Sequence, residues 1–168
     1  MKVLETDRLT LRWVEAADAE FIMRLLNEPG WLQYIGDKGI RTIDDAKGYI
    51  MKGPRAMYER EGFGLFLTER KEDRVPIGLC GLIKRDGLED VDIGFAFLAS
   101  YQSQGYAFEA AQATVKLAMN IGINRIVAIT TKDNEPSAKL LEKLDMQLEG
   151  YVTLPNDTEE LIKYGLNF

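Results

Sequence analysis

Residues 91–120 read VDIGFAFLASYQSQGYAFEAAQATVKLAMN and contain the most informative pattern in the chain. The pattern predicts a strand over 91–98, a polar turn over 99–104, and a helix rich in small side chains from Gly105 onward. The first backbone N–H groups of a helix lack internal partners, and the aligned peptide dipoles leave about half a positive charge there. A strand that passes through a glycine turn into a helix is therefore a place where an anion can bind.

The turn itself favours close contact between a ligand and the backbone. Gly105 lets the backbone approach a ligand closely, and Ala107 keeps a second point of approach small. Successive N–H groups here can surround phosphate oxygens. An ordinary strand-to-helix turn would carry the same glycine, so the turn alone leaves both interpretations open. Neither GxGxxG nor GxxxxGK(S/T) occurs, which argues against a nucleotide-hydrolysing P-loop protein.

The strand before the turn has one face with small side chains and a carboxylate. Alternate residues of a strand point to opposite faces. One face carries Val91, Ile93, Phe95 and Phe97, and the other carries Asp92, Gly94, Ala96 and Leu98. Aspartate is uncommon inside strands, and its small neighbours predict open space. Asp92 is thus a candidate general base or anchor for a substrate amine. The alternative is an edge position at which it faces solvent.

A third feature begins the next predicted helix. Asn134 is a good N-cap, and Pro136 is tolerated only in a first turn, so the helix is expected from about residue 135. Capping alone explains Asn134 without any ligand. Cys80, in an apolar strand between glycines, is typical of a small buried hydrophobic residue rather than a nucleophile.

Composition limits the classes of function. The chain has 168 residues, no histidine, one cysteine and a formal net charge of -6. We expect one domain over 1–168, no nucleic-acid partner, and no disulfide within the chain. Without histidine, Ser-His-Asp or Cys-His nucleophile pairs and histidine metal sites are impossible, and one cysteine rules out thiolate zinc sites. No apolar run is long enough for a membrane span, and the N-terminus lacks a signal-peptide core, so we expect a cytoplasmic protein.

The order of predicted elements indicates an α+β fold. Strands are predicted over 9–14, 63–69, 76–84, 91–98, 125–131, 147–153 and 161–167. Helices are predicted over 17–27, from Thr42 to about Arg60 with a disturbance at Gly53 and Pro54, from Gly105, and from 135, whereas 31–41 is expected to be loop. This mixture predicts a mixed, mainly antiparallel central sheet of about seven strands, flanked by helices.

Taken together, these features resemble the GNAT superfamily of acyl-CoA-dependent N-acetyltransferases. Residues 102–107, QSQGYA, match the family pattern Q/R-x-x-G-x-G/A, directly after a strand and opening a helix. The second cofactor segment of the family is similar to Asn134-x-x-Ser137 followed by LEKL over 141–144. The start, ETDRLTLR over 5–12, and DIGF over 92–95 resemble the branch that includes ribosomal-protein N-terminal acetyltransferases. The resemblance covers essentially the whole chain.

The resemblance implies acetyl-CoA as the acyl donor and direct attack of an amine on its thioester. Pantetheine would pair like an extra strand with the backbone near Phe97 and Leu98, and an N–H near Phe97 would polarise the carbonyl. Asn134 and Ser137 would contact the pantetheine arm, and Asp92 would take the proton. The pyrophosphate would lie on the amides of Gln102, Ser103, Gln104, Gly105, Tyr106 and Ala107.

Two departures from the family pattern concern the chemistry. Many members end the second segment in Gly-Phe, where this chain has Asp145-Met146, and many place there a tyrosine that protonates the leaving thiolate. Here Ser137, water or no specific group would supply that proton. A non-catalytic acyl-CoA-binding domain is therefore the alternative to an enzyme. The acceptor, a protein N-terminus or a small amine, is not specified, because the family builds its pocket from the first helices and the loop between them. A monomer and a homodimer are both compatible.

Overall fold

A computed structural model describes residues 1–168, and its centre is one eight-stranded sheet with the strand order β1-β2-β3-β4-β5-β6-β8-β7. The strands are β1 (Lys2–Glu5), β2 (Leu9–Arg12), β3 (Leu65–Arg70), β4 (Pro76–Ile83), β5 (Val91–Phe97), β6 (Arg125–Thr130), β7 (Gln147–Val152) and β8 (Leu161–Asn167). All neighbouring pairs are antiparallel except β5 and β6, which are parallel.

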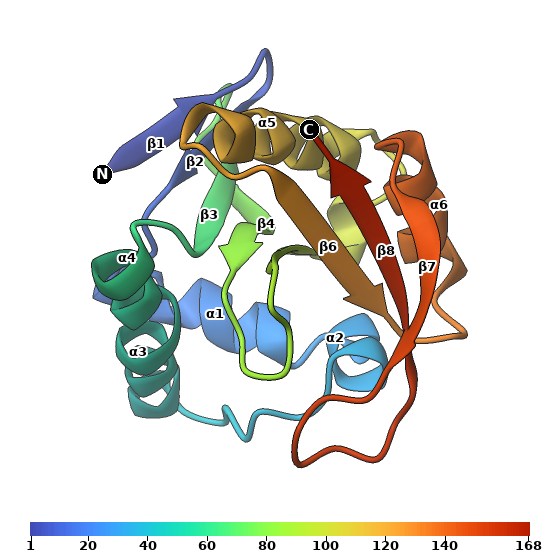
Figure 1. The fold of residues 1–168 in the computed structure, drawn as a ribbon. Helices are drawn as coiled ribbons and strands as arrows, with labels where there is room; N and C mark the ends of the chain where they lie inside the picture. Colours follow the sequence, from blue (N-terminus) through green and yellow to red (C-terminus); the bar gives the residue numbers. More distant parts are fainter.

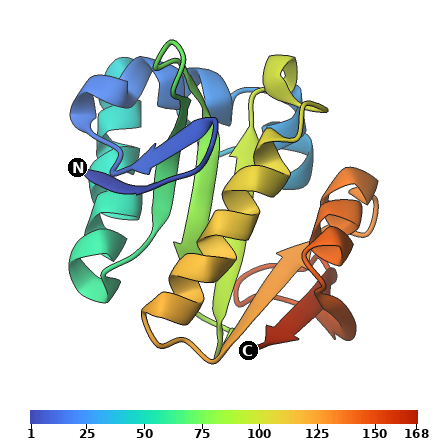
Figure 2. The ribbon, with the colours of Figure 1, turned by 90° about the horizontal axis from the view of Figure 1, so that it is seen from above.

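Helices cover both faces of the sheet, as Figures 1 and 2 show. The helices are α1 (Ala19–Leu26), α2 (Pro29–Tyr34), α3 (Ile43–Ile50), α4 (Ala56–Glu61), α5 (Tyr106–Asn120) and α6 (Glu135–Lys143). Helices α1, α2 and α3 pack with Leu67, Leu79 and Leu98 in one apolar cluster. Helices α5 and α6 pack in a second cluster with Phe66, Ile93 and other strand residues. The sheet therefore separates two cores.

The parallel pair β5 and β6 divides the sheet. Only Val91↔Ile126 and Asp92↔Val127 pair between them, at the start of both strands. Beyond these residues the strands diverge, which Figure 2 shows as two arrows leaving neighbouring starting points. On its far side β5 stays paired with β4 from Asp92 to Phe97, and β6 pairs with β8 along its length. A gap thus opens inside the sheet toward the carboxyl ends of both strands.

The α+β class and the mainly antiparallel sheet are confirmed, with two local differences. Strand β1 was not predicted and makes eight strands rather than seven. The loop expected over 31–41 begins instead with α2, because Pro29 occupies the first helical turn rather than ending a helix. The predicted helix from Thr42 is real, and the expected disturbance at Pro54 is a π-helical segment, Met51–Arg55, between α3 and α4.

The structure can also be compared with smaller predictions about a helix cap, the cysteine and membrane-spanning segments. Thr42 and Asp45 form the expected capping box at the start of α3. Cys80 is fully buried, as its apolar surroundings predict. No helix of the structure has the length and apolar character needed to span a bilayer.

Candidate active site

The edge of β5 that faces the gap carries unpaired backbone groups. Leu98 donates its N–H to the carbonyl of Ile77 at 2.9 Å, which makes these two residues a hydrogen-bonded pair of the antiparallel ladder. Because such pairs alternate along a ladder, Ala96 and Gly94 also point toward β4. The N–H groups of Phe95 and Phe97 therefore point the other way, into the gap, where β6 has already diverged. Phe95 was not among the predicted site residues.

This geometry supports one of the two predicted pantetheine contacts and removes the other. The N–H of Phe97 faces the gap, while its carbonyl accepts a hydrogen bond from the side-chain amide of Gln102 at 3.0 Å. Leu98 has no free backbone group, because its N–H is bonded to Ile77 and its carbonyl accepts from Tyr101 at 3.0 Å. Its side chain is also buried. The expectation that Leu98 pairs with pantetheine is therefore wrong, since the ladder with β4 already uses its amide.

The turn after β5 presents a run of free amides. The first backbone N–H of α5 with a partner belongs to Glu109, which donates to the carbonyl of Gly105 at 3.1 Å. None of the N–H groups from Ser103 to Phe108 has a hydrogen-bond partner within the chain. Gly105 has φ +83° and Ser103 has φ +62°, so the backbone turns in the left-handed region at both positions. Such a run of N–H groups at a helix N-terminus suits an anion with several oxygen atoms.

The run of free amides is displaced by one residue from the predicted one. The N–H of Gln102 donates to the carbonyl of Ala99 at 3.2 Å, so its backbone is not free for a phosphate. Its side-chain amide instead donates to the carbonyl of Phe97. Phe108, which was not predicted, adds a free amide at the other end of the run. The side chain of Tyr106 is buried, which leaves only its N–H for a ligand.

Arg8, another residue that was not predicted, supports this turn from β2's side of the sheet. Its guanidinium pairs with Glu109 at 2.7 Å, donates to the carbonyl of Gln104 at 3.0 Å, and lies 4.3 Å from the ring centroid of Tyr106. Partial burial raises the pKa of Glu109, but hydrogen bonds from Thr6 and Arg8 outweigh it and hold that pKa below its ordinary value. Arg8 thus neutralises the one carboxylate in the first turn of α5, which would otherwise repel an anion.

On the β6 side, the residues that follow the strand at the open end of the gap include Asn134 and Ser137. Asn134 is the N-cap of α6, and its Oδ1 accepts the N–H of Ser137 at 3.2 Å, as the capping interpretation predicts. Its Nδ2 and the hydroxyl of Ser137 have no partner in the chain. Helix α6 follows β6 as α5 follows β5, so both helix N-termini lie beyond the carboxyl ends of the two parallel strands. The region beyond the carboxyl ends of parallel strands is where open α/β sheets bind ligands.

The departures at the end of α6 have structural reasons. Asp145 has φ +67°, the left-handed conformation that glycine usually takes after a helix. Met146 donates its N–H to the carbonyl of Leu141 at 3.1 Å and buries its side chain in the core. Asp145-Met146 thus ends the helix in the same way as a Gly-Phe pair would.

Asp92 does not face open space. Its side chain is 1% exposed, and both oxygen atoms accept from Arg85, at 3.0 and 2.9 Å. The face over Gly94 is also filled, since a Cβ there would lie 3.0 Å from Ile83 Cδ1. Burial raises the pKa of Asp92 above its ordinary value, although Arg85 lowers it. The expectation of an open groove is therefore wrong at this end of β5, where Ile83 and Arg85 cover the strand.

Comparison with known proteins identifies the family of this chain. The sequence model of the acetyltransferase (GNAT) domain matches residues 8–147, most of the chain. The N-acetyltransferase YnaD of Bacillus subtilis (strain 168) is 32% identical over 149 residues, which cover 88% of this chain and 84% of the relative. The chain belongs to the GNAT family of acetyltransferases. Enzymes of this family transfer an acyl group to an amine, and the predicted resemblance is confirmed.

Solved structures of GNAT proteins share the fold over the whole chain. A GNAT acetyltransferase from Bacillus anthracis has a TM-score of 0.80 at 27% identity, covering 99% of this chain and 98% of that chain. RimL, a ribosomal L7/L12 alpha-N-protein acetyltransferase solved in complex with coenzyme A, has a TM-score of 0.84, covering 100% of this chain and 98% of that chain. At 18% identity the second likeness shows the fold alone.

The buried pair of Arg85 and Asp92 makes an asymmetric prediction about stability. Arg85 is one-third exposed and Asp92 is buried, so Arg85→Ala strands a carboxylate in the core and should cost about 3 kcal/mol of unfolding free energy. In Asp92→Asn the guanidinium can turn to water, and the expected cost is about 1 kcal/mol. The double variant should regain most of the Arg85→Ala loss. Urea unfolding of the three variants measures these values.

The same pair predicts the direction of a pH dependence. Without Arg85 the pKa of Asp92 rises further, so the folded protein keeps a proton that the unfolded chain releases above about pH 4. The stability of Arg85→Ala relative to the wild type should therefore fall as pH rises from 4 to 8. Equal losses in both single variants, with no change across this pH range, would show that the pair is not a buried one.

Proposed function

We propose that this chain is an acetyl-CoA-dependent N-acetyltransferase that binds donor and amine together and lets the amine attack directly. The observation that carries the proposal is the run of six unpartnered amides from Ser103 to Phe108, placed beside a gap into which two further amides point. A pyrophosphate needs several hydrogen-bond donors close together, and the extended amide-containing arm attached to it needs further donors along a strand edge. RimL was solved with coenzyme A, which supports the same ligand here.

Residues on both sides of the gap, along β5 and after β6, suit acetyl-CoA as a ligand. The amides of 103–108 would hold the pyrophosphate, with the positive end of the α5 dipole behind them. The edge of β5 would receive the pantetheine arm as an added strand, at Phe95 and Phe97. Asn134 Nδ2 would donate to that arm from the opposite side. Acetyl-CoA, when bound, supplies the acyl group as an activated thioester.

The chemistry requires a donor for the developing oxyanion and a path for two protons. The N–H of Phe95 or Phe97 would stabilise negative charge on the thioester oxygen. An α-amine has an ordinary pKa of about 7.7–8.0, so water can accept its proton near neutral pH, whereas an alkylamine with a pKa of about 10.4 would react through its small neutral fraction, and faster as pH rises. Arg85 occupies both oxygens of Asp92, so we propose that Asp92 holds Arg85 in place rather than acting as the base. The unbonded hydroxyl of Ser137 is our candidate donor for the leaving thiolate.

Two glycines at opposite ends of α5 test the phosphate site. Gly105 and Gly122 have φ +83° and +90°, so valine at either position meets a similar backbone strain. Only Gly105 lies within the run of free amides. We expect Gly105→Val to lower CoA affinity at least about a hundredfold by calorimetry, because several charge-assisted hydrogen bonds are lost together. Gly122→Val should keep wild-type affinity, and circular dichroism should confirm that both variants fold.

Catalysis is tested on the same proteins by thiol release from acetyl-CoA over a panel of amines and N-terminal peptides. Amine-dependent release that is lost in Gly105→Val is the expected result. Retained affinity in that variant would show that the pyrophosphate lies elsewhere. CoA binding without turnover on any amine would instead identify a non-catalytic acyl-CoA-binding domain.

Two substitutions at Asn134 separate capping from binding. Aspartate keeps the oxygen that accepts the N–H of Ser137 but removes the Nδ2 donor, whereas alanine removes both. Asn134→Asp should keep the wild-type melting temperature and bind CoA about fivefold more weakly, the effect of one lost hydrogen bond. Asn134→Ala should weaken binding similarly and also lose about 1 kcal/mol of stability. Wild-type affinity in Asn134→Asp would limit this residue to capping.

A further inference from the structure

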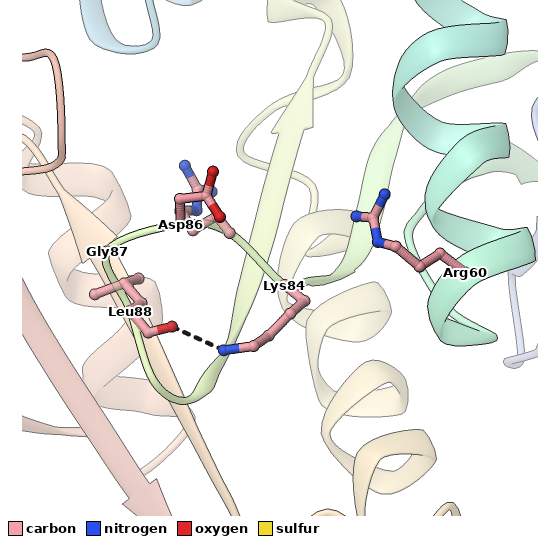
Figure 3. Close-up of a pocket in the computed structure, with 6 residues that line it drawn as sticks. Arg60, Lys84, Asp86, Gly87 and Leu88 are labelled. Carbon is pink, nitrogen blue, oxygen red and sulfur yellow. Dashed lines mark hydrogen bonds between the residues drawn. The ribbon is translucent and has the colours of Figure 1, made fainter.

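A polar cavity lies at the other end of β5 from the turn of free amides. It has a volume of about 610 Å³ and lies between α4 and the connection from β4 to β5 (Figure 3). Its lining consists of Arg60, Lys84, Arg85, Asp86, Gly87 and Leu88. Three of these six residues are basic and one is acidic, in a chain whose net charge is -6. The cavity is therefore locally cationic against the overall charge.

The basic groups of this cavity differ in how they are held. Lys84 donates from Nζ to the carbonyls of Leu88 and Glu89, at 2.8 and 2.6 Å, which fixes the connection around it. Arg85 is held by Asp92. Arg60 reaches toward the connection from α4, as Figure 3 shows, and makes no hydrogen bond or ion pair within the chain. Asp86 also has no ion-pair partner. Arg60 is thus the cation available to an incoming ligand.

The cavity adjoins the closed end of the gap between β5 and β6. Asp92, which holds Arg85, pairs with Ile83 of β4 and with Val127 of β6 at the point where the gap begins. The turn of free amides lies beyond the opposite end of β5, about 20 Å away along a strand of this length. A ligand in the cavity would therefore approach the gap from the end opposite to the donor.

We infer that this cavity binds an anionic group of the amine acceptor, so that the preferred acceptors are small amines that carry a carboxylate or a phosphate. The inference rests on the proposed function, since it names the class of the second substrate. Arg60 supplies a guanidinium that can bind either group through two parallel hydrogen bonds. Asp86 opposes the same anion by charge repulsion, and its effect should therefore have the opposite sign.

Acceptor pairs that differ only in the anionic group test this inference. The probes are β-alanine, 4-aminobutanoate and 6-aminohexanoate with their amides, and 2-aminoethyl phosphate with ethanolamine. For each pair the selectivity is the ratio of kcat/KM for the anionic amine to that for its neutral counterpart. Arg60→Gln should lower this ratio about tenfold, through a higher KM for the anionic amine, as loss of a charged hydrogen bond predicts. Asp86→Asn should raise it.

Lys116→Gln is the matched control. Lys116 is exposed on α5 and does not line the cavity, and its substitution changes the net charge by the same amount as Arg60→Gln. The selectivity ratio should stay at the wild-type value in this control. An equal change in Arg60→Gln and Lys116→Gln would mean that net charge, not the cavity, sets the preference. No change in Arg60→Gln, or a preference for the neutral amines in the wild type, would overturn the inference.

A binding measurement keeps the two proposals separate. Calorimetric titration of the same amines into protein saturated with CoA needs no turnover. Binding of anionic amines that Arg60→Gln weakens and Asp86→Asn strengthens would support the cavity even if no thiol were released, in which case only the proposed catalysis fails. Turnover of neutral amines with no effect of Arg60 on anionic ones would leave catalysis standing and remove the cavity assignment.

Discussion

The divergence of two parallel strands in the middle of the sheet is the constraint on which the rest of this structure depends. Backbone N–H groups inside a sheet are nearly always paired, and an unpaired buried one costs about as much as a lost hydrogen bond. Here β5 and β6 pair only at their first residues, and the amides of Phe95 and Phe97 remain without a strand to accept them. A ligand with carbonyl groups along an extended arm, as proposed for acetyl-CoA, would satisfy those donors.

The turns that follow the two strands extend the same site. Because β5 and β6 are parallel, the helices that follow them begin at the same edge of the sheet. One helix start offers six free amides, and the other offers the side chains of Asn134 and Ser137. Arg8 stabilises the first of these by pairing with Glu109 and by holding the carbonyl of Gln104. The cationic cavity around Arg60 lies at the opposite end of β5 from this turn, so the proposed donor and the proposed acceptor would approach the strand from different ends.

Much of this could be read from the sequence, because local patterns set the strands, the helix starts and the faces of β5. Gly105 and Asn134 were correct as turn and cap, since their conformations depend on neighbouring residues alone. The failures concern partners that lie outside strand β5 itself. The pairing of Leu98 with Ile77 removes a predicted contact, and the pairing of Asp92 with Arg85 removes a predicted free base. Strand order and side-chain pairing decide such features, and periodicity carries no signal for either. The single-domain boundary and the catalytic role of Ser137 remain predictions.

Amide hydrogen exchange along β5, followed by NMR with and without acetyl-CoA, tests the central claim most directly. The account predicts an alternating pattern. Gly94 and Ala96 point toward β4 and should be protected in both states, whereas Phe95 and Phe97 should exchange readily in the free protein and become protected with acetyl-CoA bound. Uniform protection of all four amides in the free protein, or no change at Phe95 and Phe97 on binding, would contradict the claim that this strand edge receives the donor.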